Sequence, residues 1–277
     1  MKKIITYLIL VIFIIAGILF FLTRVPAVQD ALFQRLAQNL ISTAPNIFPE
    51  EDSLSALVCG SKSPLPHPTR AETCVMIKAG EETFIFDVGN KSIDNLRNWR
   101  VPLNQLNSIF ISHLHSDHIA ELPEIHMWNW IGTGRQSKLK VYGPEGINQV
   151  LNGFTEAFSL DWKYRNDHHG DKFAPLKAAG FDGYEITDFS EPVYESNGIV
   201  ITAFLVDHKP IDPSLAFKIE YKGRSIVLSG DTIYSEAILN NSKNVDVLFH
   251  EAFHKGTLDM MYNALPENSS SRIAIVD

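Results

Sequence analysis

The chain has 277 residues, of which 45% are hydrophobic and 20% are charged, and its formal net charge is −8. This composition excludes a disordered tail, a collagen-like fibre and a disulfide-stapled miniprotein, and it predicts a domain with a full hydrophobic core. Two cysteines allow at most one disulfide, so the cysteine count does not identify a cellular compartment.

The first element in chain order is an uncharged apolar run. Residues 4–22 carry no charged side chain, follow Lys2 and Lys3, and are long enough to span the ~30 Å hydrocarbon core of a bilayer. We interpret residues 1–27 as a signal peptide or an uncleaved membrane anchor. The two lysines favour a cytoplasmic N-terminus and an exported body on the periplasmic or extracellular side. Without residues 1–27 the chain keeps 21 basic and 32 acidic residues, a net charge of −11.

An amphipathic helix and a linker are predicted over residues 28–53. Apolar side chains recur at helical spacing over residues 28–41. Pro45 and Pro49 then mark the linker. The main domain is therefore expected to cover residues 54–277.

Short strands and helices alternate in this main domain. Apolar runs predict strands at residues 54–58, 74–79, 83–88, 108–112, 139–142, 199–206, 215–221, 225–228 and 245–249. Helices are predicted at residues 93–99, 144–158 and 234–239. The alternation predicts an α/β domain with a mixed sheet.

The strongest chemical signal directly follows the apolar strand at residues 108–112. His113, His115, Asp117 and His118 fall within six residues, and imidazole and carboxylate groups are common ligands of divalent metal ions. The two histidines that are two positions apart can share one ion, whereas the adjacent aspartate and histidine can face a second. A solvated polar loop is the alternative, but so dense a group of ligand-type residues favours a metal site.

Two later strand ends carry further candidate ligands. His208 follows the predicted strand 199–206 and offers a third imidazole for the first ion, although a histidine at a strand end is often structural. Asp231 follows Gly230 after the strand 225–228. It can bridge two ions, and it can equally serve as a turn residue or a helix cap.

The order of these motifs resembles the metallo-β-lactamase fold hydrolase superfamily, and most of all its ribonuclease Z and arylsulfatase-like branch. The resemblance covers residues 54–277 and rests on His-x-His-x-Asp-His at 113–118 and on Gly-Asp-Thr at 230–232. It implies an αββα sandwich. It also includes Asp87, similar to an aspartate that supports the metal loop, and His250, in a His-Glu-Ala segment that mostly lies behind the ligands.

The resemblance implies two divalent metal ions, zinc first, with manganese or iron as alternatives. For one ion the resemblance implies three imidazole ligands, from His113, His115 and His208. For the other ion it implies Asp117 and His118, with the Asp231 carboxylate bridging the two ions. Two such ions activate a water molecule and polarise the scissile oxygen. Asp117 would also orient or deprotonate that water and is the implied catalytic residue.

The C-terminal part departs from the resembled pattern. Family members carry a catalytic histidine and a last metal ligand beyond the His-Glu-Ala segment, whereas this chain has no histidine after His254. We therefore expect a truncated form in which the second half of the sandwich is incomplete and activity is impaired.

Several other side chains keep two interpretations. His168 and His169 are expected in a loop, where they either face the substrate or form a surface turn. Cys59 and Cys74 lie on neighbouring predicted strands, either as a disulfide or as two buried thiols. His67, His126 and His254 are expected to be structural.

Three functions fit these features. The first is an exported or membrane-anchored metal hydrolase that acts on a small ester, a lactone, or a sulfate or phosphate ester. The second is a ribonuclease Z-like endonuclease that matures tRNA, and the third is a catalytically impaired metal-binding protein. Export, the acidic net charge and the lack of a Gly/Pro/Lys-rich arm favour the small ester and argue against a nucleic-acid substrate.

Overall fold

The computed structural model describes residues 2–42, 47–49 and 52–266, and the chain divides into two compact units, residues 1–46 and residues 47–277. The prediction of an incomplete C-terminal end concerns residues 267–277, which lie outside the described residues.

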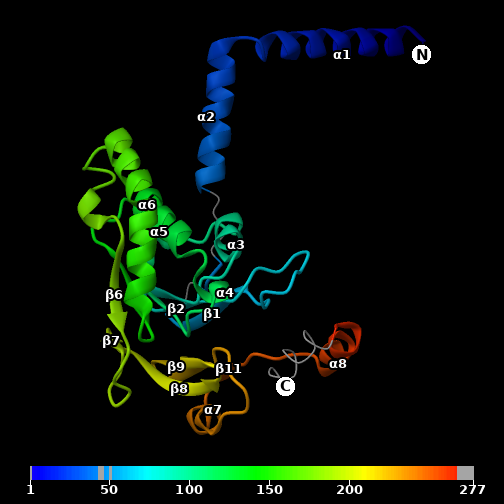
Figure 1. Ribbon diagram of the computed structural model, residues 1–277. Helices are drawn as coiled ribbons and strands as arrows, with labels where there is room; N and C mark the ends of the chain where they lie inside the picture. The colour runs from blue at the N-terminus through cyan, green and yellow to red at the C-terminus, as the bar shows by residue number, and fades with distance from the viewer. Residues whose placement is uncertain (1, 43–46, 50–51, 267–277) are drawn as a thin grey trace. The chain divides into compact units, whose positions relative to one another are not determined.

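The first unit consists of helix α1 (Lys2–Leu22) and helix α2 (Pro26–Ser42) (Figure 1). Within the described residues, no single helix is both long and apolar enough to cross a membrane. Ile9–Leu22 and Pro26–Leu36 meet that criterion only together, as a pair bent by 84°. The single-helix anchor predicted over residues 4–22 is therefore not supported, because the criterion is met only across this bend.

Six strands form the first sheet of the second unit, in the order β1-β2-β3-β4-β5-β6. Their bounds are Leu54–Gly60, Cys74–Ala79, Glu82–Phe86, Leu106–Phe110, Leu139–Gly143 and Phe181–Glu185. The pairs β1–β2 and β2–β3 are antiparallel, whereas β3 to β6 run parallel. Because parallel strands end at the same edge of a sheet, the residues that follow β3 and β4 meet there.

Five strands form the second sheet, in the order β11-β10-β9-β8-β7. Their bounds, from β7 to β11, are Tyr194–Ser196, Ile199–His208, Ile211–Tyr221, Arg224–Leu228 and Val247–Phe249. The long hairpin of β8 and β9 forms its centre (Figure 1). Strand β10 pairs with β11 in parallel.

Helices complete the second unit. Their bounds, from α3 to α8, are Ser92–Asn98, Ser116–Ile119, Leu122–Thr133, Ile147–His169, Glu236–Asn241 and Lys255–Ala264. Short 3-10 turns occur at Leu103–Gln105 and Leu176–Ala178. The predicted elements are recovered within a few residues at their ends, except that α6 continues to His169 instead of ending at residue 158. The elements α5, α8, β6 and β7 were not predicted.

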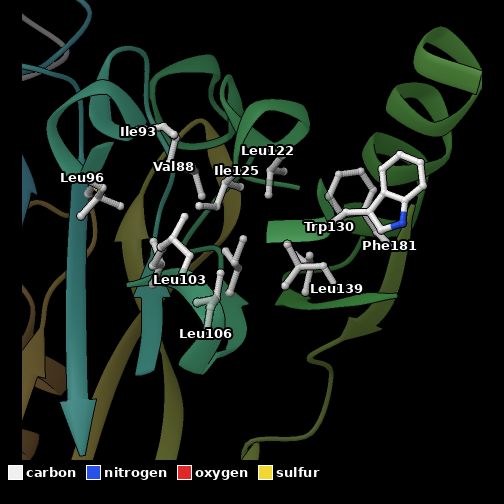
Figure 2. Packing of buried hydrophobic residues seen from close by; sticks show 14 of the residues in the cluster. Val88, Ile93, Leu96, Leu103, Leu106, Leu122, Ile125, Trp130, Leu139 and Phe181 are labelled. Carbon is white, nitrogen blue, oxygen red and sulfur yellow. The ribbon is translucent and has the colours of Figure 1, made fainter. Parts of the chain in front are cut away.

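Alternating side chains of the first sheet fill two separate cores. Ile85 and Ile109 belong to a core with residues of helices α3, α5 and α6. Trp130 of α5 is fully buried in this core (Figure 2). Phe110 points the other way, and its ring centroid lies 5.6 Å from that of Phe217 in the second sheet. The helix layer and the two packed sheets agree with the predicted α/β class.

The buried His126 provides a test of this packing. Its ring centroid lies 4.6 Å from that of Trp162 and 5.1 Å from that of Phe181, and its Nε2 accepts the Gly180 N–H at 2.8 Å. Burial lowers the pKa of His126 to about 4. The His126 imidazole therefore binds a proton less readily in the folded chain than in the unfolded chain. The stability that the neutral ring contributes is fully present above pH 6.5 and is lost as the pH falls toward 4.

We expect this group to lower the free energy of unfolding by about 2 kcal/mol between pH 7 and pH 5. His126→Gln keeps a hydrogen-bond acceptor but cannot titrate, so its stability should fall less over the same range. Urea denaturation of both proteins at the two pH values measures the difference. An equal loss in both proteins would show that His126 is not the titrating group.

Candidate metal centre

Three histidines converge where β4 and β8 end. His113 and His115 follow β4, and His208 is the last residue of β8. The ring centroid of His113 lies 4.8 Å from those of both His115 and His208, and its Nε2 is 2.9 Å from His115 Nδ1. One nitrogen from each ring lies within 4.8 Å of the other two. The three rings thus direct their nitrogens toward one point.

A second group of donor atoms adjoins the first. His113, His118 and Asp231 also place one donor atom each within 4.8 Å of the others. His118 Nε2 lies 3.5 Å from Asp231 Oδ1 and 3.7 Å from Asp117 Oδ2. The other oxygen of Asp231 lies 3.9 Å from His208 Nε2. Asp231 therefore stands between the two groups of histidines.

The residues of both groups fit a divalent metal ion. The Nε2 atoms of His118 and His208 are buried and form no hydrogen bond to any residue that the structure describes. A buried nitrogen without a partner costs free energy, so two of them beside carboxylates call for a ligand. Imidazole and carboxylate donors are what zinc and similar ions require.

Asp87 holds the loop that carries these ligands. Its Oδ1 accepts the Ser112 backbone N–H at 2.8 Å, and its Oδ2 accepts the Ser112 hydroxyl at 2.8 Å and lies 2.9 Å from His118 Nδ1. With Nδ1–H donated to Asp87, His118 presents Nε2 to the donor cluster. Asp87 has a φ of 59°, in the left-handed region that aspartate tolerates better than most residues.

Gly230 allows the strand end with Asp231 to approach. A Cβ atom at this position would lie 2.5 Å from the Leu215 carbonyl oxygen and 3.2 Å from Ser112 Cβ. Only glycine fits this close approach, at a φ of 58°. The two sheets can therefore bring Asp231 to the loop that follows β4.

Burial and neighbouring charges set the protonation of the cluster. Burial lowers the pKa of His113 to about 2 and also lowers that of His208, so both are neutral and able to bind metal at pH 7. Burial alone would raise the pKa of Asp231, but His118 overcomes this effect and lowers it to about 2. Burial raises the pKa of Asp117 above its usual value.

A cavity of about 630 Å³ opens beside the cluster and is lined by Asp117 and Asp231. Its wall also carries five basic or imidazole side chains, namely Lys62, His67, Arg70, His250 and His254. His67 and His254 were expected to be structural, and no role was predicted for Lys62 or Arg70. The sequence does contain a signal for this loop, because Lys62, His67 and Arg70 lie in one proline-containing segment between two predicted strands.

His250 lines this cavity and does not join the donor groups. Its Nδ1 lies 2.6 Å from the Glu251 carbonyl oxygen. Glu251 in turn accepts the Thr232 N–H, and its own N–H donates to Ser229 at 3.1 Å. The His-Glu-Ala segment therefore braces the strand end that carries Asp231.

The structure places His168 and His169 elsewhere. They are exposed at the end of α6 and do not line the cavity, so the predicted loop around them is wrong. The helix continues past residue 158 because Asp161 pairs with Arg165 at 2.8 Å and Lys163 pairs with Asp167, both at i,i+4 spacing.

Comparisons with known proteins agree with this geometry. Residues 63–270 match the family described as anti-Pycsar protein Apyc1. Ribonuclease Z of Mycobacterium bovis (strain BCG) is 31% identical over 204 residues, which cover 73% of this chain and 71% of that protein. Ribonuclease Z of Mycobacterium marinum is 31% identical over 198 residues, which cover 71% and 69%.

Solved structures share the fold. Human tRNase Z, short form, superposes with a TM-score of 0.57 and 20% identity, covering 80% of this chain and 88% of that chain. The metallo-β-lactamase fold protein YhfI from Bacillus subtilis has a TM-score of 0.53 and 19% identity, covering 71% and 70%.

Proposed function

We propose that this chain, which belongs to the Apyc1 family and to the ribonuclease Z branch of the metallo-β-lactamase superfamily, hydrolyses phosphodiester bonds in RNA. Membership of the superfamily makes it a metal-dependent hydrolase. One observation carries the choice of substrate: the donor cluster opens onto a cavity whose wall carries Lys62, His67 and Arg70. A phosphodiester is the anionic group that such a wall attracts.

The comparisons favour the ribonuclease Z-like hypothesis over the small-ester hypothesis that the sequence had favoured. The small ester was preferred because the chain is acidic overall, but net charge is an average over the whole surface. One loop of the cavity wall carries Lys62, His67 and Arg70, and the relatives with 31% identity are ribonuclease Z enzymes. Neither the small-ester substrate nor the arylsulfatase-like part of the resemblance is supported.

The proposed ligands are those implied by the motif. His113, His115 and His208 would hold one divalent ion, and Asp117, His118 and Asp231 would hold a second, with zinc as the proposed metal. Ions bound there would supply an activated water and would neutralise charge on the phosphoryl oxygens.

The chain's own side chains supply the remaining steps. Asp117 lines the cavity, and its raised pKa suits it to orient the attacking water and accept its proton. Lys62 is held by Glu72 at 2.6 Å, whereas the Arg70 side chain makes no hydrogen bond or ion pair within the described residues. Arg70 is thus the side chain best able to bind a substrate phosphate.

A substrate panel tests the proposal. The zinc-loaded chain is incubated with precursor tRNA, single-stranded RNA, bis(p-nitrophenyl) phosphate, p-nitrophenyl sulfate and p-nitrophenyl acetate. We expect hydrolysis of the phosphodiesters, loss of it with a chelator, and recovery when metal is restored. Hydrolysis of the sulfate or acetate alone would overturn the proposal. No turnover with both ions bound would favour the catalytically impaired form.

Arg70→Ala should raise KM for an RNA substrate about tenfold with little change in kcat, because a charged hydrogen bond contributes about 1.5 kcal/mol. The difference should shrink as salt is added. Lys177→Ala is the matched control, since Lys177 is exposed and does not line the cavity. An unchanged KM for Arg70→Ala at low salt would remove this residue from the substrate site.

Export of the catalytic unit also remains our proposal. The Cys59–Cys74 disulfide supports it, because structural disulfides persist mainly in oxidising compartments. Cell fractionation of the full chain, with a variant lacking residues 1–27 as the control, tests it. Recovery of the full chain in the cytoplasmic fraction would contradict export.

A further inference from the structure

A disulfide closes the segment that carries three basic or imidazole side chains of the cavity wall. Cys59 lies near the end of β1 and Cys74 begins β2, and their Cα atoms are 5.0 Å apart. Both side chains are buried. Between them, residues 60–73 carry Lys62, His67 and Arg70 into the wall. Of the two interpretations that the sequence allowed, a disulfide or two buried thiols, the structure has the disulfide. It lies at the base of a loop that lines the cavity.

The loop has few other attachments. The Ser61 and Lys62 N–H groups both donate to the Ala71 carbonyl, and the Thr69 and Arg70 N–H groups both donate to His67 Nδ1. In the described part of the chain, the hydrogen bonds of residues 61–71 all end within the segment 59–74.

The loop therefore depends on its base for its position. Glu72 exchanges two hydrogen bonds with Asn90, and the Gly89 N–H donates to the Thr73 carbonyl. On the β1 side the backbone pairing is irregular, because the register shifts between Val58 and Gly60. Cys59 lies at that shift. The disulfide is thus a covalent link at the irregular point of this strand pair.

We propose that the Cys59–Cys74 disulfide positions the 60–73 segment for substrate binding, so that its loss weakens binding of the substrate and leaves the metal centre intact. The inference rests on the proposed phosphodiesterase function. The cysteines act through Lys62, His67 and Arg70 and are positioning residues. Without the link, the loop samples more conformations, and part of the binding energy is spent on ordering it.

The test compares the zinc-loaded wild-type chain with the Cys59→Ala/Cys74→Ala double variant. We expect KM for RNA to rise about fivefold with kcat within about twofold, because only the binding wall is released. In an Arg70→Ala background the same cysteine substitutions should change KM much less, because the disulfide affects KM through the contact that Arg70 makes with the substrate. A fall in kcat with unchanged KM would overturn the proposal.

A second readout needs no substrate. Trypsin should cut the double variant faster after Lys62 and Arg70, and the amides of Ser61 and Lys62 should exchange hydrogen faster. Leu151→Ala is the matched control, because it weakens the core that contains both cysteines without touching the loop. Equal proteolysis and exchange in wild type and double variant would overturn the proposal, as would an equal rise in KM for Leu151→Ala.

These experiments distinguish failure of the proposed function from failure of the proposed role of the disulfide. If the wild-type chain cleaves no phosphodiester, the proposed function fails, while proteolysis and exchange still decide whether the disulfide orders the loop. If the double variant does not fold, wild-type chain reduced with tris(2-carboxyethyl)phosphine replaces it in the same measurements.

Discussion

Replacement of His118 by alanine is expected to lower kcat/KM for RNA hydrolysis on the order of 10³-fold. His118 is fully buried, and its Nε2 lies within 3.7 Å of carboxylate oxygens of both Asp117 and Asp231. Its loss would remove the only imidazole proposed for the second ion. An ion at such a site contributes several kcal/mol to transition-state stabilisation, and about 1.4 kcal/mol corresponds to a tenfold rate change.

The measurement is a steady-state assay together with metal analysis of the purified protein. His118→Ala should bind about one equivalent of metal fewer than the wild type. His169→Ala is the control, because His169 is exposed at the end of α6, outside the cavity. Wild-type activity in His118→Ala would exclude the assigned metal centre, whereas wild-type metal content with lost activity would give His118 a different role.

Substitution of Asp87 by alanine is expected to weaken metal binding by up to about 100-fold, the upper end of the range for groups that hold a ligand. Asp87 binds both the Ser112 backbone and His118 Nδ1, so its removal frees the loop and the ring together. Three buried donors, the Ser112 N–H, the Ser112 hydroxyl and His118 Nδ1, would also lose their acceptor. Competition with a chelator of known affinity gives the binding constant.

One further variant and one metal titration sharpen this experiment. Ser112→Ala removes one donor to Asp87 and leaves the contact with His118, so its loss of affinity should be smaller. Activity of Asp87→Ala should recover in part at high metal concentration, since the ligands themselves remain. Unchanged affinity in Asp87→Ala would show that the loop after β4 holds its shape without this carboxylate.

The local part of the site could be predicted from the sequence. His113 to His118 are neighbours in the chain, and a strand end followed by one helical turn brings their side chains together without help from distant elements. The strands on either side were predicted from local apolar runs, whereas Asp87 was singled out only through the resemblance to the family. The helix α6 was predicted too short, because its second half is polar and is supported by ion pairs rather than by an apolar face.

The sequence by itself determined the ligand types, their local spacing and the α/β class, since these depend on residues close together in the chain. Only the tertiary structure decided which distant residues join them. The packing of two sheets brings His208 and Asp231 to the loop after β4, and strand pairing brings Cys59 to Cys74. Folding also places the loop with Lys62, His67 and Arg70 beside Asp117 and Asp231 on the wall of one cavity, and the net charge of the chain cannot reveal that placement.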